Sequence, residues 1–104
     1  MISKWFDATE AKKFGAEIAT LINHRTPNKV ISKNQERLVK KYDKRHEVTL
    51  GLIEKRLENF KKNNHLNIYK KAQLGNTFKY SLLESGYDQD FCNKTTTWLL
   101  LKCK

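Results

Sequence analysis

The sequence predicts an all-α fold: a four-helix bundle-like domain built on one long central amphipathic helix, about 33–64, with three shorter helices. Three observations predict it. The 104 residues include only 4 glycines and 1 proline, fewer than a turn-rich β fold needs. Apolar residues recur at helical intervals, and residues typical of helix ends separate the apolar stretches. Residues 1–104 are therefore expected to form a single helical domain with a modest core.

The long helix is predicted from an apolar stripe whose members follow one another at steps of three and four residues. The stripe consists of Val39, Tyr42, His46, Leu50, Ile53, Leu57 and Phe60. Ser32 followed by Gln35 is typical of a capping box, in which two side chains bond the first free backbone N–H groups. At 1.5 Å rise per residue, this helix would be about 48 Å long.

The first short helix is expected to begin at Asp7, the predicted N-cap, and to end near His24. Glu10, at the third helical position, completes a pattern that resembles a capping box. Pro27 follows in a connecting segment, because the residue before a proline avoids the helical conformation.

The next short helix is predicted from Ile68 to Ser85, with Asn67 as its cap. Its expected core face consists of Ile68, Ala72, Gly75, Phe78 and Leu82. Gly86 and Tyr87 indicate a helix stop, in which glycine takes the left-handed conformation and the tyrosine folds back.

Asp88 caps the predicted last helix, whose core face is expected to hold Phe91, Thr95, Trp98, Leu99 and Lys102. Cys92 and Cys103 would lie about 16 Å apart along it. A disulfide needs Cα atoms within about 7 Å, so two free thiols in a reducing compartment are expected.

Gly15 and Gly75 each fall on an apolar face of a predicted helix. A glycine in such a place allows two backbones to approach closely, because it has no Cβ. Both glycines are therefore predicted to face neighbouring helices in the bundle.

The chain is strongly basic, with 21 Lys and Arg against 11 Asp and Glu and a net charge of +10. Residues 32–66 hold the largest share. Such a surplus favours anionic partners, and it also keeps a small protein in solution. The candidate partner or phosphate contacts lie opposite the apolar stripe: Lys33, Arg37, Lys40, Lys44, Lys55 and Lys62. Five acids on the same helix reduce the local positive field.

Several function classes are disfavoured. The three histidines and two cysteines lack the close spacing of a zinc site, so no metal or other cofactor is expected. No glycine elbow or phosphate loop is present, which argues against an enzyme and a small-molecule substrate. No apolar run approaches the roughly 20 residues that span a bilayer, and Met1–Phe6 is too short for a secretory signal. The sequence therefore predicts a cytoplasmic protein without membrane attachment.

The leading hypothesis is a small, non-enzymatic helical binding or assembly module, homodimeric, with a basic surface for an acidic partner. The alternative is a nucleic-acid-binding protein that contacts the phosphate backbone through the basic row. Neither the first nor the third helix is long enough to cover the long helix alone. Each could cover one half, the long helix could project and pair with a second copy, or it could bend at Gly51. Four apolar residues off the main faces favour a homodimer: Val48, Leu52, Leu100 and Leu101.

Overall fold

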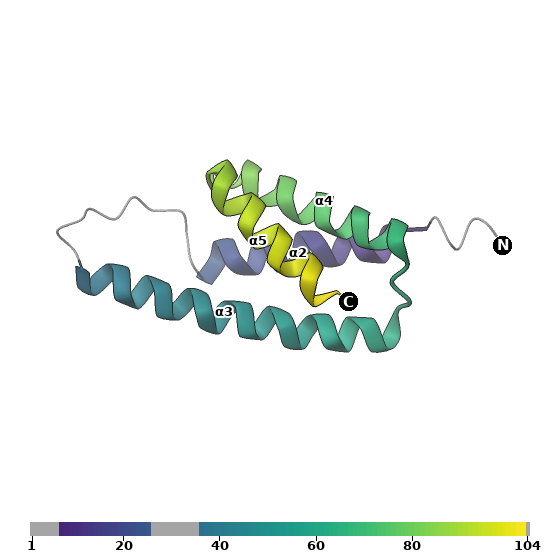
Figure 1. Ribbon diagram of the computed structural model, residues 1–104, viewed down its shortest axis with the longest axis horizontal. Coiled ribbons are helices and arrows are strands. Elements are labelled where there is room, and N and C mark those ends of the chain that lie inside the picture. Colours follow the sequence, from purple (N-terminus) through teal and green to yellow (C-terminus); the bar gives the residue numbers. More distant parts are fainter. Residues whose placement is uncertain (1–6, 26–35, 104) are drawn as a thin grey trace.

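The computed structural model describes residues 7–25 and 36–103, and within 36–43 it describes the backbone only. This part of the chain forms four helices and no strand: α2 (Thr9–Arg25), α3 (Glu36–Asn63), α4 (Ile68–Glu84) and α5 (Gln89–Lys102). Figure 1 shows α3 running along one side of the other three helices. The all-α fold class is confirmed. The predicted capping box at Ser32 and Gln35 lies outside the described residues.

The centre of the fold is the crossing of α2 and α4, which share the most extensive contact of any described helix pair. A Cβ atom added to Gly15 would lie 2.7 Å from the carbonyl oxygen of Leu74 and 3.3 Å from the backbone nitrogen of Phe78. Gly75 faces Leu100 of α5, whose Cδ2 would lie 3.0 Å from an added Cβ. Both glycines therefore face neighbouring helices, as predicted, while a central place for the long helix is not confirmed.

The apolar stripe of α3 packs against this core from its middle to its C-terminal end. Ile53 and Leu57 are buried, and Phe60 is partly buried against the core. The Phe60 ring stacks on Phe14 of α2, with ring centroids 4.4 Å apart and planes 15° from parallel. Thr49, which the predicted stripe omitted, is also fully buried.

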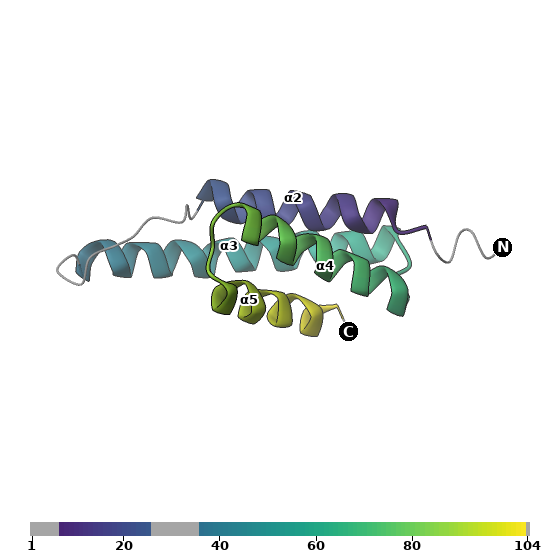
Figure 2. The ribbon, with the colours of Figure 1, turned by 90° about the horizontal axis from the view of Figure 1, so that it is seen from above.

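The N-terminal turns of α3 extend past the end of α2 (Figures 1 and 2). Arg25, the last residue of α2, donates from Nε to Oγ1 of Thr49 at 3.0 Å, so α2 ends beside the middle of α3. Val39 and Tyr42 of the predicted stripe belong to the projecting part, and their side chains lie outside the described portion. The shorter helices therefore do not divide α3 into two covered halves.

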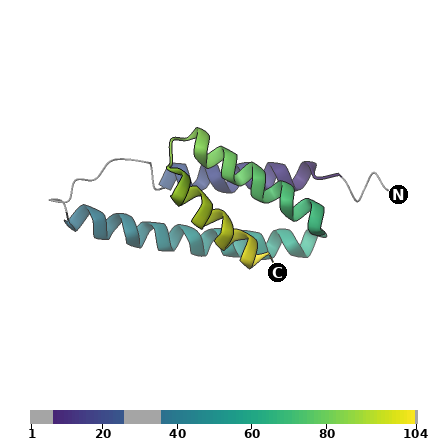
Figure 3. The same cartoon turned by 45° about the horizontal axis from the view of Figure 1, so that its top comes forward.

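α5 lies along the same half of α3 as α2 does, and Figure 3 shows it running between α4 and α3. At one end, the rings of His46 and Phe91 lie 5.5 Å apart between centroids. At the other end, Lys102 forms an ion pair of 3.3 Å with Glu54 of α3. These contacts place α5 on the flank of α3 that carries Glu54.

Two N-terminal caps occupy their predicted positions. The side chain of Asn67 accepts a hydrogen bond from the backbone N–H of Lys70 at 2.8 Å, at the start of α4. The side chain of Asp88 accepts one from the backbone N–H of Phe91 at 2.7 Å, at the start of α5. Each bond satisfies a backbone donor that the first helical turn leaves free.

The predicted stop of α4 is also confirmed. Gly86 has φ of 96°, the left-handed conformation that glycine adopts at low cost. The backbone N–H of Tyr87 donates to the carbonyl of Leu82 at 3.3 Å, and that of Gly86 donates to the carbonyl of Leu83 at 3.0 Å. This pair of bonds is the Schellman arrangement.

The start of α2 differs from its prediction by one residue. The first helical bond runs from the N–H of Lys12 to the carbonyl of Ala8, so Asp7 precedes the cap and Glu10 is the second helical residue. Asp7 Oδ1 instead accepts from the backbone N–H and the hydroxyl of Thr9, at 3.1 and 2.7 Å.

The predicted core face of α4 is wrong at its N-terminal end. Ile68 is 83% exposed and Ala72 is also exposed, whereas Leu74 is fully buried. The reason is the crossing at Gly15, which turns the side of α4 that carries Leu74 and Phe78 toward α2. Gly75, Phe78 and Leu82 of the predicted face are buried, and the buried face is shifted from the predicted one toward Leu74.

The buried face of α5 is also shifted from the predicted one. Phe91 and Trp98 are only partly buried and Lys102 is exposed, while the inward residues are Cys92, Thr95, Thr96 and Leu99. Thr95 and Leu99 of the predicted face are confirmed, while Phe91 and Trp98 pack against the edge of the core.

Replacing Gly51 with alanine is expected to raise the free energy of unfolding by about 1 kcal/mol. A Cβ added there meets no atom within 4 Å, and α3 continues through this position without a break. The gain arises because alanine loses less backbone entropy than glycine in a helix. Urea denaturation of the wild type and of Gly51→Ala measures the difference in the free energy of unfolding. A lower stability of the variant would show that another part of the protein packs against α3 at position 51.

Candidate functional site

The six predicted contact residues fall into three groups. Lys44, Lys55 and Lys62 are exposed on α3. Arg37 and Lys40 belong to the first turns of α3, where the side chains lie outside the described portion, and Lys33 precedes it. At 100° per residue, the three described lysines lie within about 20° of one line along the helix. The structure therefore places half of the predicted row on one exposed side.

Two arginines that the predicted row omitted lie beside these lysines. Arg45 and Arg56 are both exposed, on the side of α3 that adjoins α2. Arg45 directly follows Lys44 in the sequence, and Arg56 directly follows Lys55. The signal for Arg56 was available, since it stands four residues after Leu52 and so on the same side of the helix.

Two aliphatic side chains stand among these cations. Val48 is 49% exposed and Leu52 is 37% exposed, although both belong to a helix with a buried apolar face. We name this surface the α3 basic face, and it consists of Lys44, Arg45, Val48, Leu52, Lys55 and Arg56. Single exposed aliphatic residues are common. Val48 and Leu52 differ because they stand on adjacent turns of α3 among four cations, so this surface could attract a partner through both apolar contact and charge.

Three acids of α3 have described side chains, and they lie on one flank of the helix. Glu54 pairs with Lys102 of α5, where both side chains are partly exposed. Glu47 and Glu58 are exposed on the same flank as Glu54, at about 120° or more from Leu52 around the helix. Glu47 stands three residues after Lys44 and Glu58 three residues after Lys55, so these acids reduce the positive field at the lysines, whereas Arg45 and Arg56 lie farther from them around the helix.

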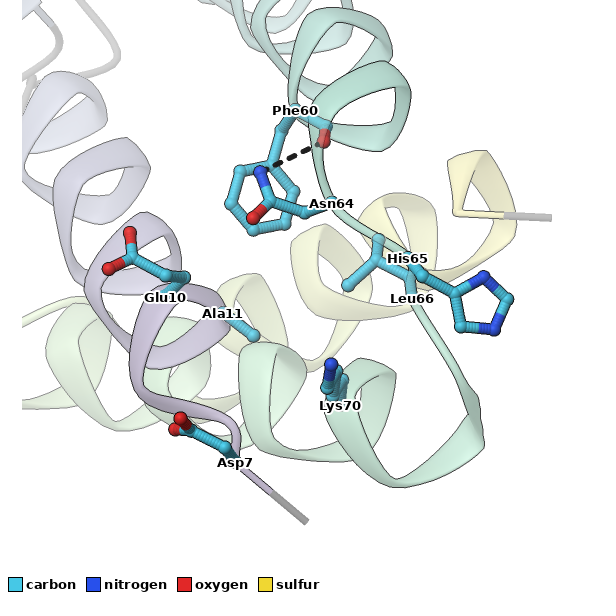
Figure 4. A pocket seen from close by; sticks show the side chains of 8 residues that line it. All are labelled: Asp7, Glu10, Ala11, Phe60, Asn64, His65, Leu66 and Lys70. Atoms are coloured by element: carbon cyan, nitrogen blue, oxygen red, sulfur yellow. Dashed lines mark hydrogen bonds between the residues drawn. The ribbon is translucent and has the colours of Figure 1, made fainter. Parts of the chain in front are cut away.

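A small pocket lies where the start of α2, the end of α3 and the start of α4 meet (Figure 4). Its volume is about 230 Å³, and its lining includes Asp7, Glu10, Phe60, His65 and Lys70. Figure 4 shows the Asp7 and Glu10 carboxylates on α2 and the His65 ring directed away from them. The polar groups thus come from three separate elements.

The local bonds in this pocket serve the helix ends. The hydroxyl and backbone N–H of Thr9, with a smaller contribution from Lys70, hold the pKa of the Asp7 carboxyl below its ordinary value. Asn64 donates from Nδ2 to the carbonyl of Phe60 at 3.2 Å, at the last turn of α3. Asp7 therefore stays ionised and stabilises the start of α2, a structural role.

Cys92 and Cys103 are both buried and do not form a disulfide, as predicted. Burial raises the pKa of each thiol, because the thiolate loses its hydration. The Cys92 thiol donates to the carbonyl of Tyr87 at 3.7 Å. Both thiols therefore belong to the packing of α5.

Iodoacetamide is expected to modify Cys92 and Cys103 far more slowly in the folded protein than in the unfolded chain. Both thiols are buried and kept protonated, whereas the thiolate is the reactive form. The folded chain therefore binds more protons than the unfolded one as the pH rises above about 8.5, and its stability should fall there. Mass spectrometry of the labelling time course, with and without urea, measures the rates, and equal rates would contradict the packing of α5.

Within residues 7–25 and 36–103, no three His, Cys, Asp or Glu side chains gather in a group that could hold a metal ion. None of the four described helices combines the length and the apolar composition that crossing a bilayer requires. The comparisons with known proteins returned no matching family model, no similar curated protein and no similar solved structure.

Proposed function

We propose that this protein is a small, non-enzymatic helical binding module that receives an acidic protein partner on the α3 basic face. In this proposal α2, α4 and α5 form the scaffold of a helical bundle, and α3 carries the binding surface. The observation that carries the proposal is the pair of exposed aliphatic residues, Val48 and Leu52, inside a ring of four cations. Apolar contact would supply affinity, and the cations would select an acidic partner.

The charge of the whole chain supports the same partner chemistry. With a net charge of +10, the protein attracts anionic molecules over a range set by the ionic strength. The α3 basic face adds a local concentration of charge, because its four cations stand within four turns of one helix. Each exposed cation alone would contribute little, so the proposal rests on the group.

The proposed assembly also includes a second copy of the chain. Leu101 is 56% exposed on α5, and Leu100 beside it is 37% exposed. α5 lies on the Glu54 flank of α3, so these leucines lie on a different side of the molecule from Leu52. We place the contact between copies at Leu100 and Leu101, which leaves the α3 basic face open in the dimer.

The Leu101→Asp variant is expected to convert the dimer to a monomer, because it places a charge where two apolar surfaces meet. Light scattering over a concentration series measures the mass of the wild type and the variant. Leu52→Asp is the matched control, since it makes the same substitution at an exposed leucine of α3. A wild-type protein that stays monomeric at the highest concentration rejects the homodimer.

Binding to an acidic polymer tests the main proposal. Fluorescent poly-L-glutamate is expected to bind at low salt, and Lys44→Glu with Lys55→Glu should weaken this binding at least tenfold. Lys12→Glu with Lys94→Glu is the matched control, since it changes the net charge equally on α2 and α5. If the two double variants bind equally, the α3 basic face has no special role and the proposal fails.

The second candidate function is binding to the phosphate backbone of nucleic acid. The alignment of Lys44, Lys55 and Lys62 along one line of α3 favours it. Such binding weakens with salt at a log–log slope of about −0.9 for each phosphate contacted on duplex DNA. Titration of a labelled duplex at several salt concentrations measures the slope. Tight duplex binding with a steep slope, together with weak binding of poly-L-glutamate, would favour this candidate over the acidic protein.

A further inference from the structure

A groove runs between α2 and α3 beside the α3 basic face. Its volume is about 580 Å³ and its surface is mainly apolar. The lining consists of Lys13, Ala16, Glu17, Thr20, Leu21 and His24 from α2 with Arg56 from α3. We name it the α2–α3 groove. Figure 2 shows the two helices side by side along this length.

The groove belongs to the outer side of α2. Gly15, which meets α4, lies about 140° or more around α2 from Thr20 and Lys13. The core therefore occupies the other side of this helix. The buried residues Ile18 and Ile22 face that core and are fully covered.

The groove and the α3 basic face share Arg56. Leu52 stands four residues before Arg56, and Val48 stands four residues before Leu52, so all three share one strip of α3. We expect this strip to extend the apolar surface that Leu21 and Ala16 form on the α2 side of the groove. From Lys13 to His24 the α2 wall is about 16 Å long, which is the length of three helical turns.

Cations flank this surface on both sides. Lys13 stands on α2, and Arg45 and Arg56 stand on α3. Glu17 is the one acid in the lining of the groove. The α2 edge is close to neutral, with Lys13 and Glu17, and the α3 edge carries arginines. An apolar floor with this net positive rim matches a helix that carries an apolar stripe flanked by carboxylates.

We infer that the α2–α3 groove receives an acidic amphipathic helix of a different protein. The apolar stripe of that helix lies on Leu21, Leu52 and Val48, and its carboxylates pair with Lys13, Arg45 and Arg56. Arginine pairs with a carboxylate through two parallel hydrogen bonds, which fixes the orientation of the bound helix. The inference rests on the proposed function and adds to it the place and the form of the acidic partner.

The described helices of a second copy match the groove less well in charge than an acidic helix does. Each of the four described helices carries more lysine and arginine than aspartate and glutamate. Insertion of any of them would place like charges opposite Lys13, Arg45 and Arg56, which is unfavourable. The partner helix is therefore expected to come from another protein with the opposite charge.

Two synthetic peptides of about 18 residues test the inference, five turns being enough to fill the groove. One places leucines at i, i+3, i+4 and i+7 with glutamates on both sides, and the other contains the same residues in scrambled order. The patterned peptide is expected to bind at least tenfold more tightly. In 15N-labelled protein it should shift the amide signals of Ala16, Thr20, Leu52 and Arg56.

The outcomes separate the inference from the proposed function. If both peptides bind equally, charge alone attracts them, so the inference is overturned while the acidic partner remains. If neither binds at low salt, both ideas fail. If duplex DNA shifts the groove signals and the patterned peptide does not, a nucleic acid is the occupant and the inference is overturned.

Surface variants with matched controls complete the test. Leu52→Asp and Lys13→Glu should each reduce binding of the patterned peptide at least fivefold. Ile68→Asp and Lys12→Glu make comparable changes at exposed positions outside the groove and should leave binding unchanged. All four positions are exposed, and circular dichroism checks that each variant is folded. Light scattering that shows a dimer abolished by Leu52→Asp would identify a second copy as the occupant and overturn the inference.

Discussion

Replacing Gly15 with valine is expected to lower the free energy of unfolding by about 3 kcal/mol, at the upper end of typical overpacking costs. The first added atom would lie 2.7 Å from the carbonyl oxygen of Leu74 and 3.3 Å from the backbone nitrogen of Phe78. Both obstacles are backbone atoms, so no side-chain rotation can relieve the clash. α2 and α4 would have to separate, and with them the centre of the core.

Urea denaturation monitored by circular dichroism measures this change. Gly51→Val is the matched control, because position 51 has no neighbour within 4 Å and lies on a helix like position 15. Its expected effect is within about 0.5 kcal/mol. If the two valine variants were equally stable, the close crossing of α2 and α4 would be refuted.

The Leu57→Ala variant is expected to lose about 3 kcal/mol of stability, with a melting temperature lower by roughly 15 °C. Leu57 is 1% exposed, so alanine would leave a cavity between α3 and the core. The loss combines the transfer free energy of the deleted atoms with the contacts that the cavity walls no longer make.

Leu52→Ala provides a control on the same helix with the same chemical change. Leu52 is 37% exposed, and its truncation should cost less than about 0.5 kcal/mol. The same truncation should nevertheless weaken binding of the patterned acidic peptide, since Leu52 belongs to the proposed binding surface. If thermal melting showed equal losses for both variants, α3 would not have the buried and exposed sides described here.

These variants separate two roles that α3 combines. Its inward side, with Ile53 and Leu57, anchors the helix to the core. Its outward side, with Leu52 and Arg56, is exposed and carries the partner surface that we propose. A partner that binds the folded chain would also stabilise it by mass action. A rise in melting temperature with the patterned peptide, absent in Leu52→Asp, would therefore report the same contact independently.

Helix positions were the most predictable part of this fold. The cap residues Asn67 and Asp88 and the stop at Gly86 act through hydrogen bonds to residues within a few positions along the chain. Such signals are local, so they can be recognised without knowing the tertiary structure. The stripe of α3 from Leu50 to Phe60 was predictable for a related reason. The residues on one face of a helix recur in the sequence at steps of three and four, so the apolar face can be recognised without a structure.

The inward faces of α4 and α5 were not predictable in the same way. Ile68 was expected in the core and is 83% exposed, while Cys92 and Thr96 are buried in place of larger neighbours. Each of these helices has apolar residues on more than one side, so periodicity alone does not select the side that is buried. The crossing partner makes that selection.

The candidate surface was predictable only in part. The row that includes Lys44 and Lys55 follows from spacing along one helix, and the exposed positions of Val48 and Leu52 follow from their place off the apolar stripe. The groove that joins them to α2 does not follow, because it depends on two segments far apart in the chain.

The sequence by itself determined where α4 and α5 begin, where α4 ends and which side of α3 is apolar, because hydrogen bonds and periodicity within one helix are sufficient for these features. Only the tertiary structure decided that α2 and α4 form the centre, that α5 turns its small residues inward, and that Lys13 of α2 stands near Arg56 of α3. The physical reason is that a side chain's environment depends on which helices cross it. In this protein, the close approach permitted by Gly15 sets that arrangement.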